Sequence, residues 1–182
     1  MALMHTPVCD FGWKAPEFTL QTPTGKSFTM SENIGENGLL IAFICNHCPY
    51  VLAIIDRLVE VCKTLQDEKV GVLAVMPNNY EKYPDDSPEN MVQFAKKHDF
   101  SFPYLLDEEQ AVAKAYNAIC TPDFFGFNAS GELHYRGRID DAKLHDASNC
   151  TPDLLNAMQL IAKTGKGPEA QTPSMGCSIK WK

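Results

Sequence analysis

A continuous apolar run followed directly by two closely spaced cysteines constrains this chain more than any other feature. Residues 39–44 read Leu-Leu-Ile-Ala-Phe-Ile, an uninterrupted run that is typical of a strand buried on both faces. Cys45 and Cys48 follow at once, and between residues 51 and 65 the apolar positions recur at the spacing of an amphipathic helix. The sequence therefore predicts a central strand, a CxxC motif and a helix joined without a gap.

The rest of the chain predicts a mixed sheet flanked by helices. Residues 70–76 form a second apolar run after a helix-length crossover, so we expect a strand parallel to the first. Further strands are expected at residues 17–20 and 26–29, which form an N-terminal hairpin, and at residues 102–106, 123–127 and 132–136. Further helices are expected at residues 89–98 and 109–118 and from Thr151 onward. Residues 164–182 lack periodicity and predict an irregular C-terminal tail.

Three of the helix starts carry capping signals. Ser87 stands before Pro88, which is the pattern of an N-cap followed by a first-turn proline, and Thr151 stands before a proline in the same way. Asp107 followed three residues later by Gln110 resembles a capping box. We therefore expect each of these side chains to cap its helix.

Length and charge narrow the class of protein. A chain of 182 residues suits one α/β domain, which we place at residues 1–163, with residues 164–182 docked on it through Met175, Ile179 and Trp181. The formal net charge of −7 disfavours binding to nucleic acid or to anionic lipid. No apolar run approaches the roughly 20 residues of a membrane span, and no secretion signal is visible. We therefore expect a soluble, cytoplasmic protein.

The seven cysteines do not form a secreted disulfide framework, because their number is odd and most of them are widely spaced. In a reducing cytoplasm most of them are expected to be free thiols. Cys45 and Cys48 are the one close pair and so need a separate explanation.

A CxxC pair at a helix N-terminus is suited to dithiol/disulfide exchange. The thiolate is the reactive form of cysteine, and the unpaired N–H groups and dipole of a helix N-terminus favour that anion. Cys45 is therefore the expected nucleophile, and His47 is expected to modulate it by adding positive charge. Cys48 can then attack a mixed disulfide at Cys45 and release a reduced partner.

The other interpretations of the pair are a zinc site, a haem attachment site and two unreactive core cysteines. A closed zinc site needs two further ligands, and the chain has no second close pair. Haem attachment needs a histidine after the second cysteine, where Pro49 stands, so this interpretation fails. Two unreactive core cysteines stay an alternative, because free cysteine packs as a small apolar residue.

The order of elements, the Cys-Asn-His-Cys-Pro segment and the Thr121-Pro122 pair resemble the thioredoxin superfamily. The chain is more closely similar to the peroxiredoxin-like branch of the alkyl hydroperoxide reductase/thiol-specific antioxidant family, over about residues 8–163. The resemblance implies a thioredoxin fold in which Pro122 is a cis-proline facing the CxxC. It also implies that the backbone of Thr121 pairs with a bound peptide or thiol substrate.

The chain departs from its relatives at two places. Peroxiredoxins carry the pattern PxxxTxxC before the peroxidatic cysteine, and Ile41 and Cys45 occupy those places when the pattern is aligned on Cys48. Thioredoxins carry a buried acid in the strand before the CxxC, and residues 39–44 contain none. Proton transfer is therefore expected to use water, His47 or a residue from elsewhere in the chain.

Other cysteines and two histidines are secondary candidates. Cys120 adjoins Thr121 and is a possible third thiol, and a docked tail could bring Cys177 to the pair as a resolving thiol. His134 and His145 could join the cysteines in binding copper. Packing is the expected role of the remaining cysteines, which are Cys9, Cys62 and Cys150.

The sequence thus predicts a thiol:disulfide oxidoreductase with Cys45 attacking, Cys48 resolving and Pro122 shaping the substrate groove. A thiol-dependent peroxidase of antioxidant function and a copper-binding chaperone-like module are the alternatives. Expected partners are protein or small-molecule thiols and disulfides, with peroxide for the first alternative. We expect no cofactor and no resident metal, and a monomer or a homodimer.

Overall fold

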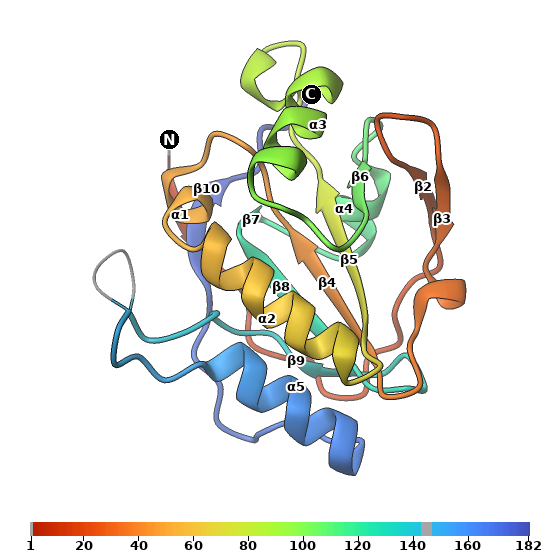
Figure 1. Cartoon of the computed structure of the whole chain (residues 1–182), viewed down its shortest axis with the longest axis vertical. Helices are drawn as coiled ribbons and strands as arrows, with labels where there is room; N and C mark the ends of the chain where they lie inside the picture. Colours follow the sequence, from red (N-terminus) through yellow and green to blue (C-terminus); the bar gives the residue numbers. More distant parts are fainter. Residues whose placement is uncertain (1, 143–146) are drawn as a thin grey trace.

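The computed structural model describes residues 2–142 and 147–182, and a seven-stranded mixed sheet forms its centre (Figure 1). The strand order is β3-β2-β6-β5-β4-β8-β9. The strands are β2 (Thr19–Gln21), β3 (Ser27–Thr29), β4 (Leu39–Phe43), β5 (Gly71–Met76), β6 (Tyr104–Leu106), β8 (Asp123–Phe127) and β9 (Leu133–Tyr135). β5 runs parallel to β4 and β6, whereas β2 pairs antiparallel with β3, and β8 with both β4 and β9. The expected α/β fold, its parallel pair and its hairpins are confirmed.

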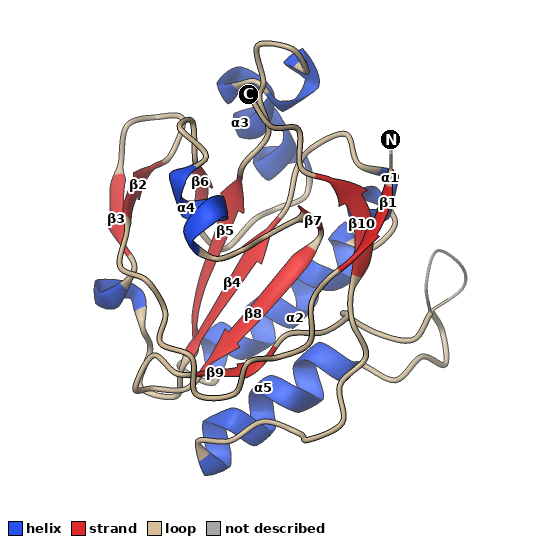
Figure 2. Ribbon diagram, turned by 180° about the vertical axis from the view of Figure 1, so that it is seen from behind, coloured by secondary structure: helices blue, strands red, loops and turns tan. Residues whose placement is uncertain are grey.

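Helices cover both faces of this sheet, and β4 is buried between them. Leu40 and Ala42 of β4 pack into the core that includes α2 (Ile55–Asp67), α3 (Pro88–Lys97) and α5 (Asp153–Thr164). Leu39, Ile41 and Phe43 point to the other face, which is covered by α4 (Ala111–Ala115) and by N-terminal segments (Figure 2). No helix in the described part of the chain is long and apolar enough to cross a membrane. β4 is therefore the doubly buried strand that its sequence predicts.

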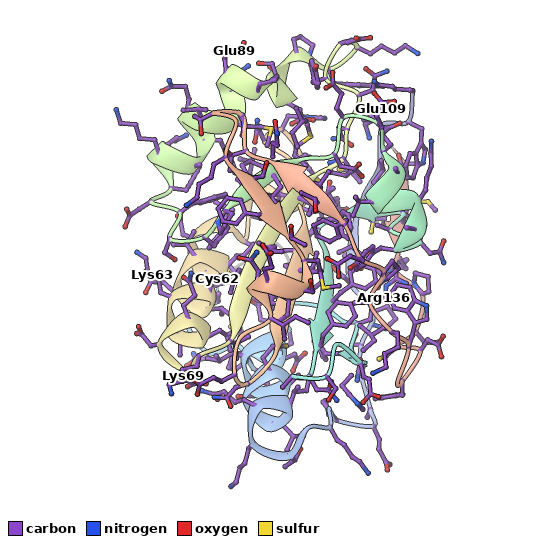
Figure 3. The ribbon with its side chains drawn as sticks, turned by 90° about the vertical axis from the view of Figure 1, so that its right-hand side faces the viewer. Cys62, Lys63, Lys69, Glu89, Glu109 and Arg136 are labelled. Atoms are coloured by element: carbon purple, nitrogen blue, oxygen red, sulfur yellow. The ribbon has the colours of Figure 1, made fainter. Side chains whose placement is uncertain are left out.

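The helix after the CxxC is divided into two. α1 (Pro49–Leu52) is followed by a tighter turn in which the Ile54 amide donates to the Val51 carbonyl, three residues back, at 3.0 Å. α2 then has the expected two faces, with Cys62 in the core and Lys63 on the outer side, where it pairs with Asp99 (Figure 3). The short α1 therefore belongs to the cysteine segment.

Ser87 and Asp107 cap their helices, but the expected capping box at Gln110 does not form. Ser87 caps α3 as expected, because its hydroxyl accepts a bond from the Asn90 amide at 3.3 Å. The Asp107 carboxylate accepts from the Val112 and Ala113 amides, so it caps α4, which begins at residue 111 instead of 109. The expected capping box is wrong, because Gln110 turns its side chain to the carbonyls of Pro77 and Lys180.

The start of α5 also differs from the prediction. This helix begins at Asp153, and Pro152 occupies the N-cap position, where it offers no side-chain cap. The hydroxyl of Thr151 therefore does not cap the helix.

The C-terminal tail is not irregular throughout, which corrects the prediction. β10 (Met175–Ser178) lies between β1 (Leu3–His5) and β7 (Cys120–Thr121) in a second, three-stranded sheet. A β-carbon at Gly176 would lie 2.1 Å from the carbonyl oxygen of Thr121. Glycine at residue 176 therefore permits the close approach of the β10 and β7 backbones. The pattern of apolar residues gives no sign of this approach.

We expect Gly176→Ala to loosen β10 from β7 while leaving the central sheet intact, because the added methyl group meets backbone that cannot move aside. Hydrogen exchange measured by mass spectrometry should accelerate in residues 174–179 and stay unchanged in β4 and β5. Ser178→Ala is the matched control, since it changes the same strand without closing the backbone approach. Unchanged protection of residues 174–179 in Gly176→Ala would contradict this account of the glycine.

Candidate active site

Cys45 and Cys48 lie just beyond the carboxyl end of β4 and are both buried, with 1% and 0% of their surface exposed. The Ile44 amide still bonds the Val75 carbonyl of β5, and the chain then turns into α1. Cys48 is the N-cap residue of α1 and Pro49 is its first residue. The helix N-terminus expected at Cys45 is therefore at Cys48, because proline fits the first helical position and sets the start of the helix.

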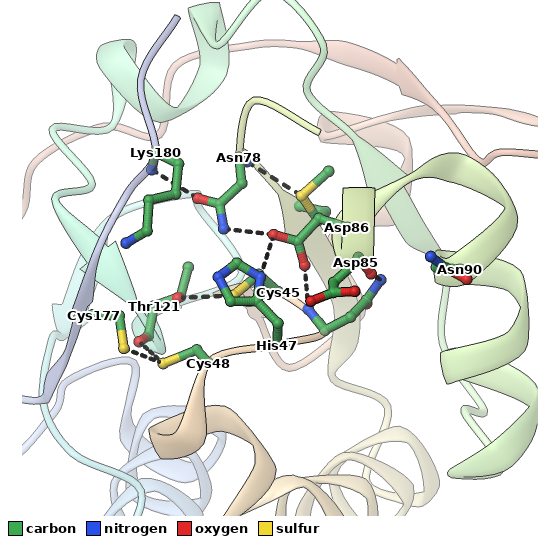
Figure 4. Close-up of polar contacts among 12 residues, drawn as sticks. Cys45, His47, Cys48, Asn78, Asp85, Asp86, Asn90, Thr121, Cys177 and Lys180 are labelled. Atoms are coloured by element: carbon green, nitrogen blue, oxygen red, sulfur yellow. Dashed lines mark hydrogen bonds and ion pairs between the residues drawn. The ribbon is translucent and has the colours of Figure 1, made fainter. Parts of the chain in front are cut away.

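The segment that carries Thr121 and Pro122 faces both cysteines (Figure 4). The Thr121–Pro122 peptide bond is cis, as the resemblance implied. The Thr121 hydroxyl lies 3.2 Å from the sulfur of Cys45, and the Thr121 carbonyl oxygen lies 3.2 Å from the sulfur of Cys48. One residue of the opposite loop thus contacts both thiols.

A buried carboxylate that the sequence analysis missed organises the segment between the cysteines. Asp86 is 0% exposed, accepts the Asn46 amide at 2.8 Å and the Asn78 side-chain amide at 2.8 Å, and lies 2.8 Å from Nδ1 of His47 (Figure 4). The His47 ring also stacks on Tyr83, with an interplanar angle of 2°. Asp86 therefore fixes both the backbone and the imidazole of the CxxC segment.

Asp86 could have been found from one signal in the sequence. It stands in the polar segment after the strand at residues 70–76, and this strand was predicted to run parallel to the one that ends at the cysteines. The carboxyl ends of adjacent parallel strands lie at the same edge of a sheet, which is where α/β proteins place their sites. An acid near that end was therefore a candidate for the proton-accepting residue that residues 39–44 lack.

The electrostatics of the pair favour a thiolate at Cys48. The pKa of Cys48 is lowered to about 5, and the largest cause is a hydrogen bond from the Cys45 thiol to the Cys48 sulfur. Hydrogen bonds from the Cys177 thiol and the Val51 amide lower it further. The pKa of Cys45 is raised because its thiol bonds Cys48, because it is buried and because Asp86 is negative. The Thr121 carbonyl oxygen is a hydrogen-bond acceptor and disfavours a negative charge on the Cys48 sulfur. More donors than acceptors face this sulfur, so the thiolate is still favoured.

The surroundings of His47 favour its charged form, because they raise its pKa. The hydrogen bond with Asp86 raises the pKa of His47 above its usual value, while partial burial and Lys180 oppose that rise. The negative charge of a Cys48 thiolate raises the His47 pKa further. An imidazolium at His47 and a thiolate at Cys48 therefore stabilise each other.

Cys177 contacts Cys48 directly, whereas Cys120 contacts the Pro122 carbonyl oxygen. The sulfur atoms of Cys177 and Cys48 lie 2.9 Å apart, and burial raises the pKa of Cys177 to about 12. The sulfur of Cys120 lies 3.8 Å from the Pro122 carbonyl oxygen, and burial raises the pKa of Cys120 strongly. Cys177 therefore contacts a thiol of the pair, whereas Cys120 has the environment of a packed, protonated cysteine.

Three side chains of the site could share a metal ion. Ligand atoms of Cys45, His47 and Asp86 all lie within 4.8 Å of one another. Both oxygens of Asp86 already contact Asn46, Asn78 or His47, so this carboxylate would have to give up a bond to bind a cation.

His134, one of the two histidines proposed for copper binding, lies away from that site. His134 lies on β9, which pairs with the end of β8 at Gly126 and Phe127. That end of β8 is opposite Leu39, at the far end of β4 from the cysteines. His145 lies outside the described residues.

Comparisons with known proteins agree with this geometry. The model of the AhpC/TSA family matches residues 11–136. An uncharacterized conserved protein from Geobacillus kaustophilus is 38% identical, with 100% of this chain and 97% of that chain covered and a TM-score of 0.94. The thioredoxin-like protein YneN of Bacillus subtilis is 26% identical over 124 residues, which are 67% of this chain and 68% of YneN.

A more distant structure shares the fold. A secreted disulfide oxidoreductase of Mycobacterium tuberculosis is 21% identical over 64% of this chain and 79% of its own, with a TM-score of 0.55. The chain belongs to the AhpC/TSA family and has a thioredoxin-like fold.

Proposed function

We propose that this protein is a thiol:disulfide oxidoreductase in which Cys45 and Cys48 cycle between dithiol and disulfide. The observation that carries the proposal is the position of the pair. Both sulfur atoms lie at the end of β4 against Thr121, and Cys48 occupies the N-cap position of α1, where helix amides favour a thiolate. The distant similarity to a secreted disulfide oxidoreductase supports the same reaction class.

Cys48 is the attacking thiolate in this proposal, and Cys45 resolves the mixed disulfide. This order reverses the one expected from the sequence, because the N–H and S–H donors surround Cys48 and the Asp86 carboxylate disfavours an anion at Cys45. A low pKa keeps Cys48 ionised near neutral pH, whereas Cys45 holds its proton until the second step.

The reaction transfers two electrons to the substrate. The Cys48 thiolate attacks one sulfur of a substrate disulfide, a Cys48–substrate disulfide forms, and the other substrate sulfur leaves as a thiolate and is protonated. Cys45 then loses its proton and attacks the sulfur of Cys48, which forms the Cys45–Cys48 disulfide and releases the second substrate thiol. A protein or small-molecule dithiol returns the pair to its reduced form.

His47 and Asp86 manage charge during these steps. The imidazolium of His47 stabilises the Cys48 thiolate before attack, and Asp86 keeps that imidazolium charged. The imidazolium donates its proton to the first leaving substrate thiolate, and the neutral imidazole that remains then accepts the proton of Cys45, because ligand atoms of Cys45, His47 and Asp86 lie within 4.8 Å of one another. This network supplies the acid that thioredoxins carry in the strand before the CxxC.

The setting proposed for this reaction is a reducing one. The proposal of a cytoplasmic location rests on the sequence, in which the odd number and wide spacing of most cysteines are unlike a secreted disulfide framework. Peroxide reduction is the alternative that the family suggests, and metal binding is the one that the Cys45, His47 and Asp86 cluster suggests. The variants described next also test both, with peroxide consumption and retained metal as readouts.

We expect Cys45→Ser and Cys48→Ser each to reduce the rate of insulin disulfide reduction to that of the uncatalysed exchange. Cys45→Ser combined with Cys177→Ala should in addition accumulate a mixed disulfide with the substrate, because the attacking thiol remains and both thiols that can attack Cys48 are gone. Mass spectrometry of the unreduced protein checks this. Cys150→Ser is the control, since Cys150 lies outside the site. Accumulation in Cys48→Ser instead would return the attacking role to Cys45.

We expect Asp86→Asn to lower the His47 pKa, because the first cause of its elevation is removed. The folded-state pKa lies above the unfolded value, so the ion pair stabilises the protein below about pH 6.5 and this contribution is lost as pH rises through the folded-state value. The stability deficit of Asp86→Asn should therefore be larger at pH 5.5 than at pH 8.5. NMR titration of the His47 ring and urea unfolding at both pH values measure these effects.

The neighbouring acid provides a matched control for that experiment. Asp85→Asn removes the same charge one residue away, and the contact of Asp85 with the CxxC segment is made by its backbone carbonyl, which accepts from the Asn46 side chain. Asp85→Asn should therefore leave the His47 titration nearly unchanged. An equal shift in both variants would mean that general surface charge sets the His47 pKa.

A further inference from the structure

The C-terminal strand occupies the position at which a substrate chain is expected to bind. β10 pairs antiparallel with β7 on one side, with Cys177 opposite Thr121, and with β1 on the other. Thr121 is the residue whose backbone the family resemblance assigns to substrate pairing. The groove beside the pair is therefore filled by the protein's own chain.

We propose that residues 175–178 are a built-in substrate, and that the external substrate of this site is an extended, cysteine-containing polypeptide that replaces them. Cys177 then takes the place of the substrate cysteine and forms a disulfide with Cys48. The part of this inference that concerns an external substrate rests on the proposed function. The part that concerns the Cys48–Cys177 disulfide rests only on the contact between the two sulfur atoms.

The contact of the two thiols carries the first part of the proposal. Their sulfur atoms lie 2.9 Å apart, and closing to the roughly 2.05 Å of a disulfide requires a shift of under about 1 Å. Both side chains are buried, with 0% and 4% of their residues' surface exposed, so the two sulfurs face each other away from solvent. A thiol held in contact with a thiolate in this way has a high effective concentration for exchange.

The backbone of the strand carries the second part. An extended peptide that adds to a sheet edge gains main-chain hydrogen bonds whatever its side chains are, and pockets for alternate side chains add specificity. β10 uses this mode at Thr121, and Gly176 permits it because any side chain there would meet the Thr121 carbonyl. A replacing substrate should therefore carry a small residue immediately before its cysteine.

Anchors at both ends hold this strand in the groove. The Ser174 hydroxyl donates to the Pro122 carbonyl at 3.0 Å, and the Ser174 amide donates to the Thr6 hydroxyl at 3.0 Å. At the other end, the Lys180 amide donates to the Asn78 side chain at 2.9 Å and the Lys180 carbonyl accepts from Gln110. Asn78 also bonds Asp86, so the anchor of the strand and the acid of the site share one side chain.

The exchange within the protein is balanced without an external oxidant or reductant. When the Cys45–Cys48 disulfide is present, the Cys177 thiol loses its proton and attacks the sulfur of Cys48. The Cys48–Cys177 bond forms, the Cys45–Cys48 bond breaks, and Cys45 leaves as a thiolate and takes up a proton. The oxidised protein therefore distributes one disulfide between two partners of Cys48, and an external substrate thiol competes with Cys177 for the same sulfur.

Disulfide mapping of the full-length chain tests the internal bond. Reduced Cys45→Ala is oxidised with diamide, free thiols are blocked, and peptides are analysed by mass spectrometry without reduction. We expect a Cys48–Cys177 peptide pair in this variant. Adding Gly176→Ala should reduce its yield several-fold, because the strand is displaced while both thiols are kept. Adding Cys120→Ala, which removes the neighbouring thiol of β7, should leave the yield unchanged.

Competition for the groove tests the external substrate. The probe is a synthetic peptide of the sequence of residues 174–179, Ser-Met-Gly-Cys-Ser-Ile, with its cysteine linked to glutathione. Reduced Cys177→Ala/Gly176→Ala protein, whose groove is open, should react with this probe several-fold faster than wild type. A matched probe with valine in place of glycine should lose most of that gain.

The outcomes separate this proposal from the proposed function. If the Cys45→Ala protein has a native circular dichroism spectrum but forms no Cys48–Cys177 disulfide, the built-in substrate is overturned. This holds at any measured rate of insulin reduction. Equal reaction of the glycine and valine probes overturns the polypeptide substrate. If the bridge forms and the probe reacts but insulin reduction does not depend on Cys45, then the oxidoreductase assignment fails and the internal disulfide stands.

Discussion

The burial of β4 on both faces is the constraint on which the site depends. A strand that is covered on both faces can end in the interior, so the cysteines that follow it begin their turn away from water. The Asn46 amide in that turn then needs a partner, and Asp86 provides it. The same carboxylate raises the pKa of His47, and the thiol and amide donors that face Cys48 lower the pKa of that cysteine. Packing in the core thus leads to the electrostatics of the thiols.

The sequence predicted the fold and the proximity of the Thr121-Pro122 pair to Cys45 and Cys48, because both depend on local patterns. The apolar run of β4, the CxxC and the Thr121-Pro122 pair can each be recognised within a few residues. Asn78 and the anchoring of Lys180 could not, because they act through contacts between residues far apart in the chain, and Asp86 had only the weaker signal of its place after a parallel strand. The strand at Met175–Ser178 was missed for a physical reason: backbone pairing and a glycine at a close approach hold it, and neither leaves a hydrophobic period.

The arrangement also explains how a thiolate is kept in a buried place. Burial alone raises thiol pKa values, as at Cys62 and Cys120, where no compensating donors are found. At Cys48 the amide and thiol donors outweigh the same penalty. The pKa of Cys48 therefore differs from those of Cys62 and Cys120 because hydrogen-bond donors face its sulfur.

The pairing of β1 with β10 ties the two ends of the chain together beside the thiols. Leu3 lies opposite Cys177, so contacts that close the site join residues separated by nearly the whole sequence. Closing a loop of this length costs more conformational entropy than closing a short one. The pairing also means that an affinity tag fused before Leu3 is attached close to Cys177. Tag placement is thus a chemical variable for this protein, and the untagged chain is the proper reference for its redox behaviour.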